Sequence, residues 1–154
     1  MGRNANWLTG MVILTAVAGA FWAGQSAGEE KVIGDVVQSE RVYELRTYYC
    51  LPGRLEALHK RFADHTLKLF EKHGMTNIAY WSPVEGEKGA DNTLIYILAH
   101  QSPEAAKASF DAIRQDPAWV EARKASEDRA GGSLTVEKGV VSVFMQATDY
   151  STIR

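Results

Sequence analysis

Apolar and polar residues alternate along Val42–Cys50, "VYELRTYYC", as they do in a β-strand whose side chains point to opposite faces. One face carries Val42, Glu44, Arg46 and Tyr48, and the other carries Tyr43, Leu45, Thr47 and Tyr49. Pro52 and Gly53 follow, and this pair favours a turn. The pattern predicts a strand that ends at a tight turn.

From Arg54 the spacing of apolar residues changes to three and four, which is typical of an amphipathic helix. Its buried stripe consists of Leu55, Leu58, Phe62 and Leu69, with His65 in the same stripe. Gly74 follows a basic last turn and favours a helix end. The pattern therefore predicts a helix from Arg54 to His73, with His65 facing the space between helix and sheet.

The rest of the chain predicts two strands, a broken helix and a last strand. The strands are expected at 75–84, 93–100 and 136–148, and the loop at 85–92 joins the first two. Ser102-Pro103 starts a helix, Asp116-Pro117 interrupts it, and the second piece ends before Gly131. The order strand, helix, strand, strand, helix, strand is that of the ferredoxin-like α+β fold, an antiparallel sheet with helices on one face.

The predicted core lies between this sheet and its helices. It comprises Leu45, Leu55, Leu58, Phe62, Leu69, Phe110 and Ile113. The strands also carry large apolar residues on the face that no helix covers, and such a face rarely remains in water. We therefore expect a two-fold homodimer of the dimeric α+β barrel type.

The first forty residues differ from the rest. Residues 1–28 have a basic start at Arg3, an uncharged apolar middle and small residues at the end, which predicts a signal peptide. The alternative is an uncleaved N-terminal anchor. Residues 29–41 read as a linker and 42–150 as the folded domain. We expect an exported protein, periplasmic or extracellular, or else a membrane-anchored one with its domain outside the cytoplasm; membrane contact would come only through a retained leader.

Composition narrows the possible partners. The net charge of −2 and pI near 6.1 give no reason to expect nucleic-acid binding. The single cysteine, Cys50, cannot form an internal disulfide bond. The histidines show no metal-ligand spacing, and no glycine-rich phosphate loop is present, so we expect neither a metal site nor a cofactor.

The candidate ligand pocket combines titratable and aromatic residues. Its members are Glu44, Arg46, His65, Trp81, Tyr96 and Trp119. His65 is the candidate acid or base, because histidine titrates near neutral pH; the alternative is simple packing. Glu44 and Arg46 share a strand face and could bind a polar ligand or form ion pairs inside the dimer. The aromatic residues could line a pocket for a planar ligand or belong to the core.

Four segments in order resemble the NIPSNAP family: "YELRTYYCLPGRLEALHKRFADHTLKLFEKHGM", "NIAYWSP", "NTLIYILAHQSPEAAKASFDAI" and "DPAW". The resemblance covers about residues 42–150 and implies a dimeric ferredoxin-like barrel without a generally assigned reaction. We expect an exported NIPSNAP-like domain that binds a small hydrophobic ligand or a protein partner. The alternative is a cofactor-independent monooxygenase or isomerase that acts on a small aromatic substrate through His65. Haem binding through a histidine is a third hypothesis.

Overall fold

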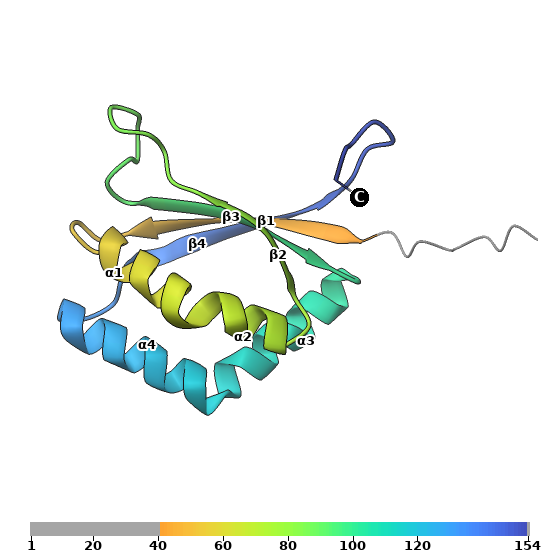
Figure 1. Ribbon diagram of the computed structural model, residues 1–154. Coiled ribbons are helices and arrows are strands. Elements are labelled where there is room, and N and C mark those ends of the chain that lie inside the picture. Colours follow the sequence, from red (N-terminus) through yellow and green to blue (C-terminus); the bar gives the residue numbers. More distant parts are fainter. Residues whose placement is uncertain (1–40, 154) are drawn as a thin grey trace, which may run out of the picture. The chain divides into compact units, whose positions relative to one another are not determined.

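The structure, a computed structural model, describes residues 41–153. Its sheet has the strand order β2-β3-β1-β4, with every neighbouring pair antiparallel. The strands are β1 (Val42–Cys50), β2 (Thr76–Trp81), β3 (Thr93–His100) and β4 (Thr135–Gln146). The helices are α1 (Leu55–Arg61), η1 (Phe62–Thr66), α2 (Leu67–Lys72), α3 (Pro103–Gln115) and α4 (Pro117–Ala130). All labelled helices lie on one side of the sheet (Figure 1), which confirms the predicted ferredoxin-like fold.

The predictions for the N-terminal residues concern a part of the chain that the structure does not describe. The expected leader at 1–28, and all of the expected linker except Arg41, lie outside the described residues. Within residues 41–153, no helix combines the length and the apolar character that crossing a membrane requires.

Side-chain caps start both α3 and α4, and the first of them, at Ser102, is the one that the sequence predicts. The Ser102 hydroxyl accepts the Ala105 N–H at 3.1 Å, and an Asp116 oxygen accepts the Ala118 N–H at 2.9 Å. The second Asp116 oxygen lies 2.7 Å from both Lys72 Nζ and His73 Nε2. These contacts hold the pKa of Asp116 below its ordinary value, and they tie the start of α4 to the end of α2.

The predicted helix Arg54–His73 contains a π-helical turn, η1, in its middle. The Leu67 N–H donates to the Phe62 carbonyl, five residues back, and the Thr66 hydroxyl donates to the Arg61 carbonyl at 3.2 Å. The wider turn rotates the following side chains backwards relative to an α-helix. Thr66 is therefore buried and His65 is exposed, so the predicted position of His65 between helices and sheet is wrong.

The two faces of β1 are the reverse of those predicted. The Tyr48 ring meets Phe62 at 5.7 Å, so the face that carries Glu44 and Arg46 is the one that points toward the helices. Leu45 pairs with Ile97 and Val143 on the other face and is absent from the core. Charged residues normally avoid an interior, but here they neutralise each other and can be buried. The other predicted core residues are confirmed, with Leu55 and Phe110 half-buried.

The face away from the helices, which we call the open face, stays largely apolar. Trp81, Val141 and Val143 are 50%, 48% and 52% exposed. At one end of this face the segment 147–153 folds over a hollow of about 280 Å³ whose floor includes Tyr43, Ile97 and Met145. Most of β4 remains uncovered on both of its faces.

Candidate functional site

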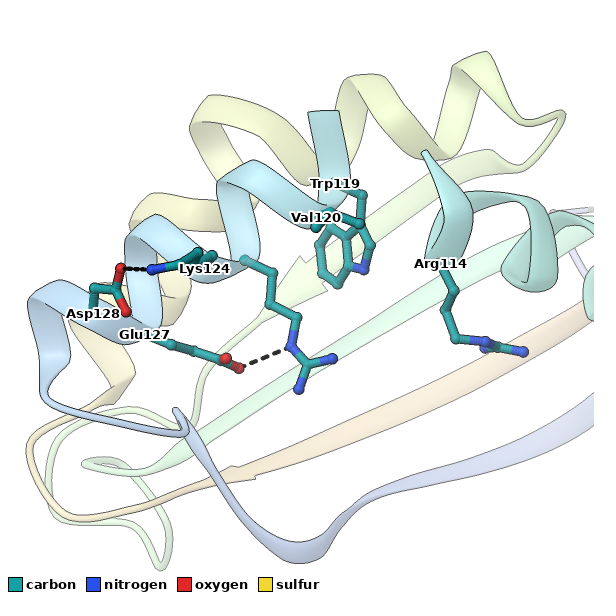
Figure 2. Close-up of a pocket in the computed structure, with 7 residues that line it drawn as sticks. Arg114, Trp119, Val120, Lys124, Glu127 and Asp128 are labelled. Atoms are coloured by element: carbon teal, nitrogen blue, oxygen red, sulfur yellow. Dashed lines mark hydrogen bonds and ion pairs between the residues drawn. The ribbon is translucent and has the colours of Figure 1, made fainter. Parts of the chain in front are cut away.

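One candidate site is a hollow of about 340 Å³ beside α3 and α4, lined by Arg114, Trp119, Val120, Arg123, Lys124, Glu127 and Asp128 (Figure 2). Its charges are already paired: Lys124 with Asp128, and Arg123 with Glu127 at 3.0 Å. Arg114 is paired with Asp111 outside the hollow. The polar groups therefore do not converge on one point, as those of a ligand pocket do.

Trp119 has a structural role in this hollow. The Arg61 guanidinium lies 5.2 Å from its ring centre, and Arg61 is itself buried. Burial lowers the pKa of Arg61, and its closest carboxylate, Glu127, is 4.0 Å away. Trp119 and Arg61 thus join α4 to α1.

The second candidate site lies on the helix-facing side of the sheet. Its residues are Glu44, Arg46, Tyr96 and His100, which we call the sheet cluster. Arg46 Nη1 donates to Glu44 Oε1 at 2.6 Å, and His100 Nε2 lies 3.1 Å from Glu44 Oε2. Glu44, Tyr96 and His100 are 2%, 0% and 3% exposed. Buried charges persist only when paired in this way.

Neighbouring charges set the ionisation of the sheet cluster. Burial raises the pKa of Glu44, but the hydrogen bond with His100 and the charge of Arg46 outweigh burial and leave this pKa below its ordinary value. Burial lowers the pKa of Arg46, whereas Tyr96, Tyr48 and Glu44 raise it above its ordinary value. Glu44 is therefore a carboxylate and Arg46 a cation at neutral pH.

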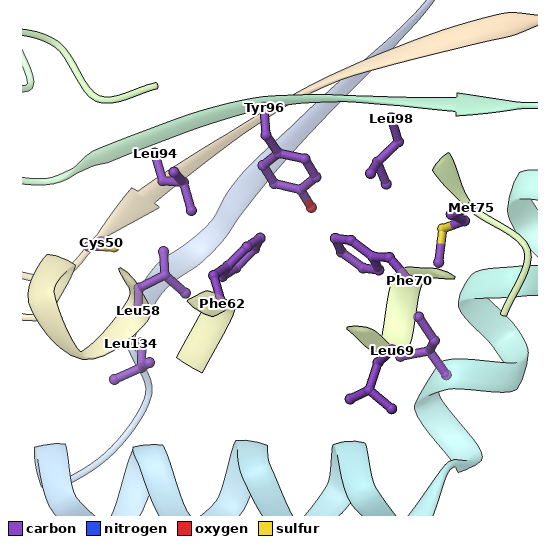
Figure 3. Close-up of a cluster of buried hydrophobic side chains, with 11 residues drawn as sticks. Cys50, Leu58, Phe62, Leu69, Phe70, Met75, Leu94, Tyr96, Leu98 and Leu134 are labelled. Carbon is purple, nitrogen blue, oxygen red and sulfur yellow. The ribbon is translucent and has the colours of Figure 1, made fainter. Parts of the chain in front are cut away.

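Aromatic rings enclose the sheet cluster on the helix side. Tyr96 descends from β3 with its hydroxyl directed toward Phe62 and Phe70 (Figure 3). Its ring centre lies 5.3 Å from that of Phe62 and 5.2 Å from that of Tyr80. Phe110 of α3 covers Arg46, with the guanidinium carbon 4.3 Å from the ring centre. The result is a charged group inside an aromatic interior.

Two polar atoms of the sheet cluster have only weak polar contacts. Among residues 41–153, neither Arg46 Nε nor the Tyr96 hydroxyl makes a hydrogen bond of ordinary length and angle, although both atoms are buried; the polar neighbours of the Tyr96 hydroxyl are Tyr48 and Arg46. Burial and the nearby Tyr48 raise the pKa of Tyr96 well above its ordinary value, so the hydroxyl stays protonated. An unpaired buried polar group destabilises a fold by about 1–3 kcal/mol and calls for an explanation.

The sheet cluster can be approached from the edge strand β4. Ser142 and Phe144 of β4 stand opposite Arg46 and Glu44 on the same face, and both are exposed. The Arg46 side chain is 14% exposed, and Phe110 above it is only half-buried. Movement of Phe110 would therefore open the guanidinium to a molecule that arrives past β4.

The structure brings together three of the six predicted site residues: Glu44, Arg46 and Tyr96. Trp81 lies on the open face and His65 on the outer surface of the helices. Sequence reasoning missed His100, although it shares a face of its strand with Tyr96 and pairs with Val42, next to Glu44. Among the described residues, no three His, Cys, Asp or Glu side chains gather as metal ligands do.

The fold and the sheet cluster define an α+β domain of ferredoxin-like plan with a polar group buried under its helices. The sequence profile of the NIPSNAP family matches residues 43–139, and the chain belongs to this family. No curated protein matches the chain.

Solved structures of other members share this fold. A NIPSNAP family protein of unknown function from Agrobacterium tumefaciens is 20% identical, with a TM-score of 0.61 over 76% of this chain and 96% of that one. An uncharacterized NIPSNAP-like domain protein from Burkholderia xenovorans is 14% identical, with a TM-score of 0.59 over 73% and 90%. The family leaves the activity of this chain unassigned.

Proposed function

We propose that this domain binds a small, largely apolar molecule between its sheet and its helices, at the sheet cluster. The observation that supports this proposal is the clustering of Glu44, Arg46, Tyr96 and His100 beneath aromatic side chains, next to the exposed strand β4. Small-molecule sites combine apolar walls with a few convergent polar groups in this way. A purely structural core would be expected to contain apolar residues at these positions.

The proposal includes a second copy of this chain as the partner on the open face. The apolar surface there is formed by Leu45, Ile97, Val141 and Val143. A two-fold contact would bury this same surface on both copies of the chain. Taking this surface together with the leader expected at 1–28, we propose an exported homodimer with its domain in the periplasm or outside the cell.

Native mass spectrometry of protein purified from its own cell envelope tests the proposal. We expect a dimer that retains an additional small mass, and we expect Arg46→Met to lose that mass. Arg54→Met is the matched control, because Arg54 lies outside the sheet cluster and its side chain makes, within the described residues, one long hydrogen bond, to the Gly132 carbonyl at 3.5 Å. A dimer that carries no additional mass in several preparations, or equal retention by Arg46→Met, would contradict the proposal.

A second candidate function is acid–base catalysis, for which the buried His100–Glu44 pair at 3.1 Å is the supporting observation. His100 would then take the role that the sequence suggested for His65, in an isomerase or cofactor-independent monooxygenase acting on a small aromatic substrate. Incubation of the retained molecule with the protein in D₂O distinguishes this function from binding alone. Deuterium uptake at a carbon atom with the wild type, and none with His100→Gln, would support catalysis.

A further inference from the structure

We infer that, in a homodimer joined through the open face, Trp81 of each copy occupies the hollow beneath residues 147–153 of the other copy. The inference rests on the proposed function, in which a second copy is the partner of the open face, and it names the contact that aligns the two copies. It depends on the chemistry and extent of the open face, on the positions of Trp81 and the hollow, and on the size of the hollow.

The open face has the chemistry of an interface between subunits. On β1 the positions that alternate with Glu44 and Arg46 are uncharged, and so are their pairing partners on β3 and β4. Trp81, Val141 and Val143 on this face are exposed. The centre of a homodimer interface lacks charges and contains large apolar and aromatic side chains. The occupant that this face fits is therefore a second surface of the same kind.

The open face is also large enough for a stable dimer. Four strands of about eight residues outline a face of roughly 500 Å². The loop 82–92 and the segment 147–153 rise on this side of the sheet at its two ends (Figure 1), so a partner sheet that lies between them contacts both. With these two flanks, the buried surface approaches the roughly 800 Å² per partner of a standard interface.

Trp81 and the hollow lie at different places on the open face. Trp81 belongs to the edge strand β2 and pairs with Ile95 of β3. The floor of the hollow includes Tyr43 of β1, which pairs with Ala99 of β3, about 13 Å further along that strand. Trp81 is not one of the residues that line the hollow of its own copy. A two-fold axis exchanges two such places, so each Trp81 meets the hollow of the other copy and the contact forms twice.

The size and the lining of the hollow suit an indole ring. A cavity of about 150 Å³ holds one benzene ring. The hollow of about 280 Å³ therefore has room for two fused rings. Ile97 and Met145 make its floor apolar, and a thioether contacts aromatic rings favourably. The Thr148 hydroxyl, which also lines the hollow, can accept the hydrogen bond that a buried indole N–H requires.

Photo-crosslinking of the full-length protein tests where Trp81 lies. With p-benzoylphenylalanine in place of Trp81, irradiation should give a covalent dimer, and peptide mass spectrometry should locate the new bond in residues 145–153 of the second copy. The control carries the same photoreactive residue in place of Val120, which is similarly exposed but lies on α4. It should give no bond to residues 145–153.

A pair of substitutions gives an independent readout in sedimentation analysis. Trp81→Ala should raise the dissociation constant of the dimer at least tenfold, because it empties both hollows. Ala147→Phe should weaken the dimer as well, because Ala147 lines the hollow and the added ring takes the space of the indole. In the double variant the phenyl ring fills the space that the indole leaves, so the two losses should not add. Val120→Ala is the control and should leave the dissociation constant unchanged.

The inference and the proposed dimer fail in distinguishable ways. A dimer whose bonds from position 81 avoid residues 145–153, or one that Trp81→Ala leaves equally tight, overturns the inference and keeps the second copy as the partner. Additive losses in the double variant also overturn it. A bond from position 81 to a different protein in intact cells, or to a retained small molecule, would make that molecule the occupant and overturn the inference. A wild type that is monomeric at micromolar concentration refutes both.

Discussion

Glu44 shows what alternation along a strand can and cannot predict. The pattern places Glu44 and Arg46 on one face correctly, and their contact at 2.6 Å confirms that they share it. Which face turns toward the helices depends on the tertiary partners His100 and Phe110, which lie more than fifty positions away in the sequence. Alternation predicts which side chains of a strand share a face, but it does not predict which face of the sheet the helices cover. Charged residues that pair with each other are therefore easily assigned to the solvent-facing side of the sheet.

Glu44→Gln should destabilise the domain by about 3 kcal/mol at pH 7, because it breaks a buried pair and leaves Arg46 without its carboxylate. The folded-state pKa of Glu44 is lowered from 4.5, so its contribution is full above that pH. The contribution disappears as the pH falls through the folded-state pKa. The difference in the free energy of unfolding between wild type and variant, measured with urea, should therefore narrow below pH 4.5.

Glu85→Gln is the control, because Glu85 is exposed in the loop between β2 and β3. It should change the free energy of unfolding by less than about 0.5 kcal/mol at any pH. A Glu44→Gln variant as stable as this control at neutral pH would show that the buried pair has no net stabilising effect.

At the scale of elements, local signals predict the starts of helices better than their interior geometry. Ser102 caps α3 as its sequence context indicates, and Asp116 similarly caps α4. The π-helical turn at Phe62–Thr66 has no comparable signal, because its residues also suit an α-helix. For this reason the sequence assigned His65 to the buried stripe, whereas Thr66 occupies it.

The irregularity in β4 leads to a further prediction at the scale of elements. Lys138 has a φ of 55°, and the register between β1 and β4 shifts between Tyr48 and Cys50. A Cβ at Gly139 would lie 2.7 Å from the Tyr49 carbonyl oxygen and 2.8 Å from that of Val136. Gly139→Ala should therefore destabilise the domain by about 1–3 kcal/mol in urea unfolding.

Glu137→Ala, an exposed change on the same strand, is the control for the bulge. It should leave the unfolding midpoint nearly unchanged. If Gly139→Ala unfolds at the same urea concentration as Glu137→Ala, the close approach of β4 to Tyr49 is not a constraint on the fold.

For the whole molecule, the order of elements and four short motifs were enough to predict the fold and the family, because periodicity reports secondary structure directly. The candidate site was only half predictable, since Glu44, Arg46 and Tyr96 meet through strand pairing while Trp81 and Trp119 lie elsewhere. Pairing of distant strands is not encoded in any one segment.

The proposed dimer gives a test at this scale. Val143→Glu places a charge on the open face and should weaken the dimer by about 3 kcal/mol, roughly a hundredfold in its dissociation constant, in sedimentation analysis. Val120→Glu on α4 is the matched control, because both valines are 52% exposed. A wild type that sediments as a monomer at micromolar concentration would refute the dimer.

The outer edge of β4 has one more consequence. In the described part of the chain, this strand of twelve residues ends the sheet, and its exposed residues include Val136, Val140 and Phe144. Such an edge can template intermolecular strand addition and fibril growth. The kink at Lys138, with its charge, interrupts this edge in the way that proteins commonly protect exposed edge strands from aggregation.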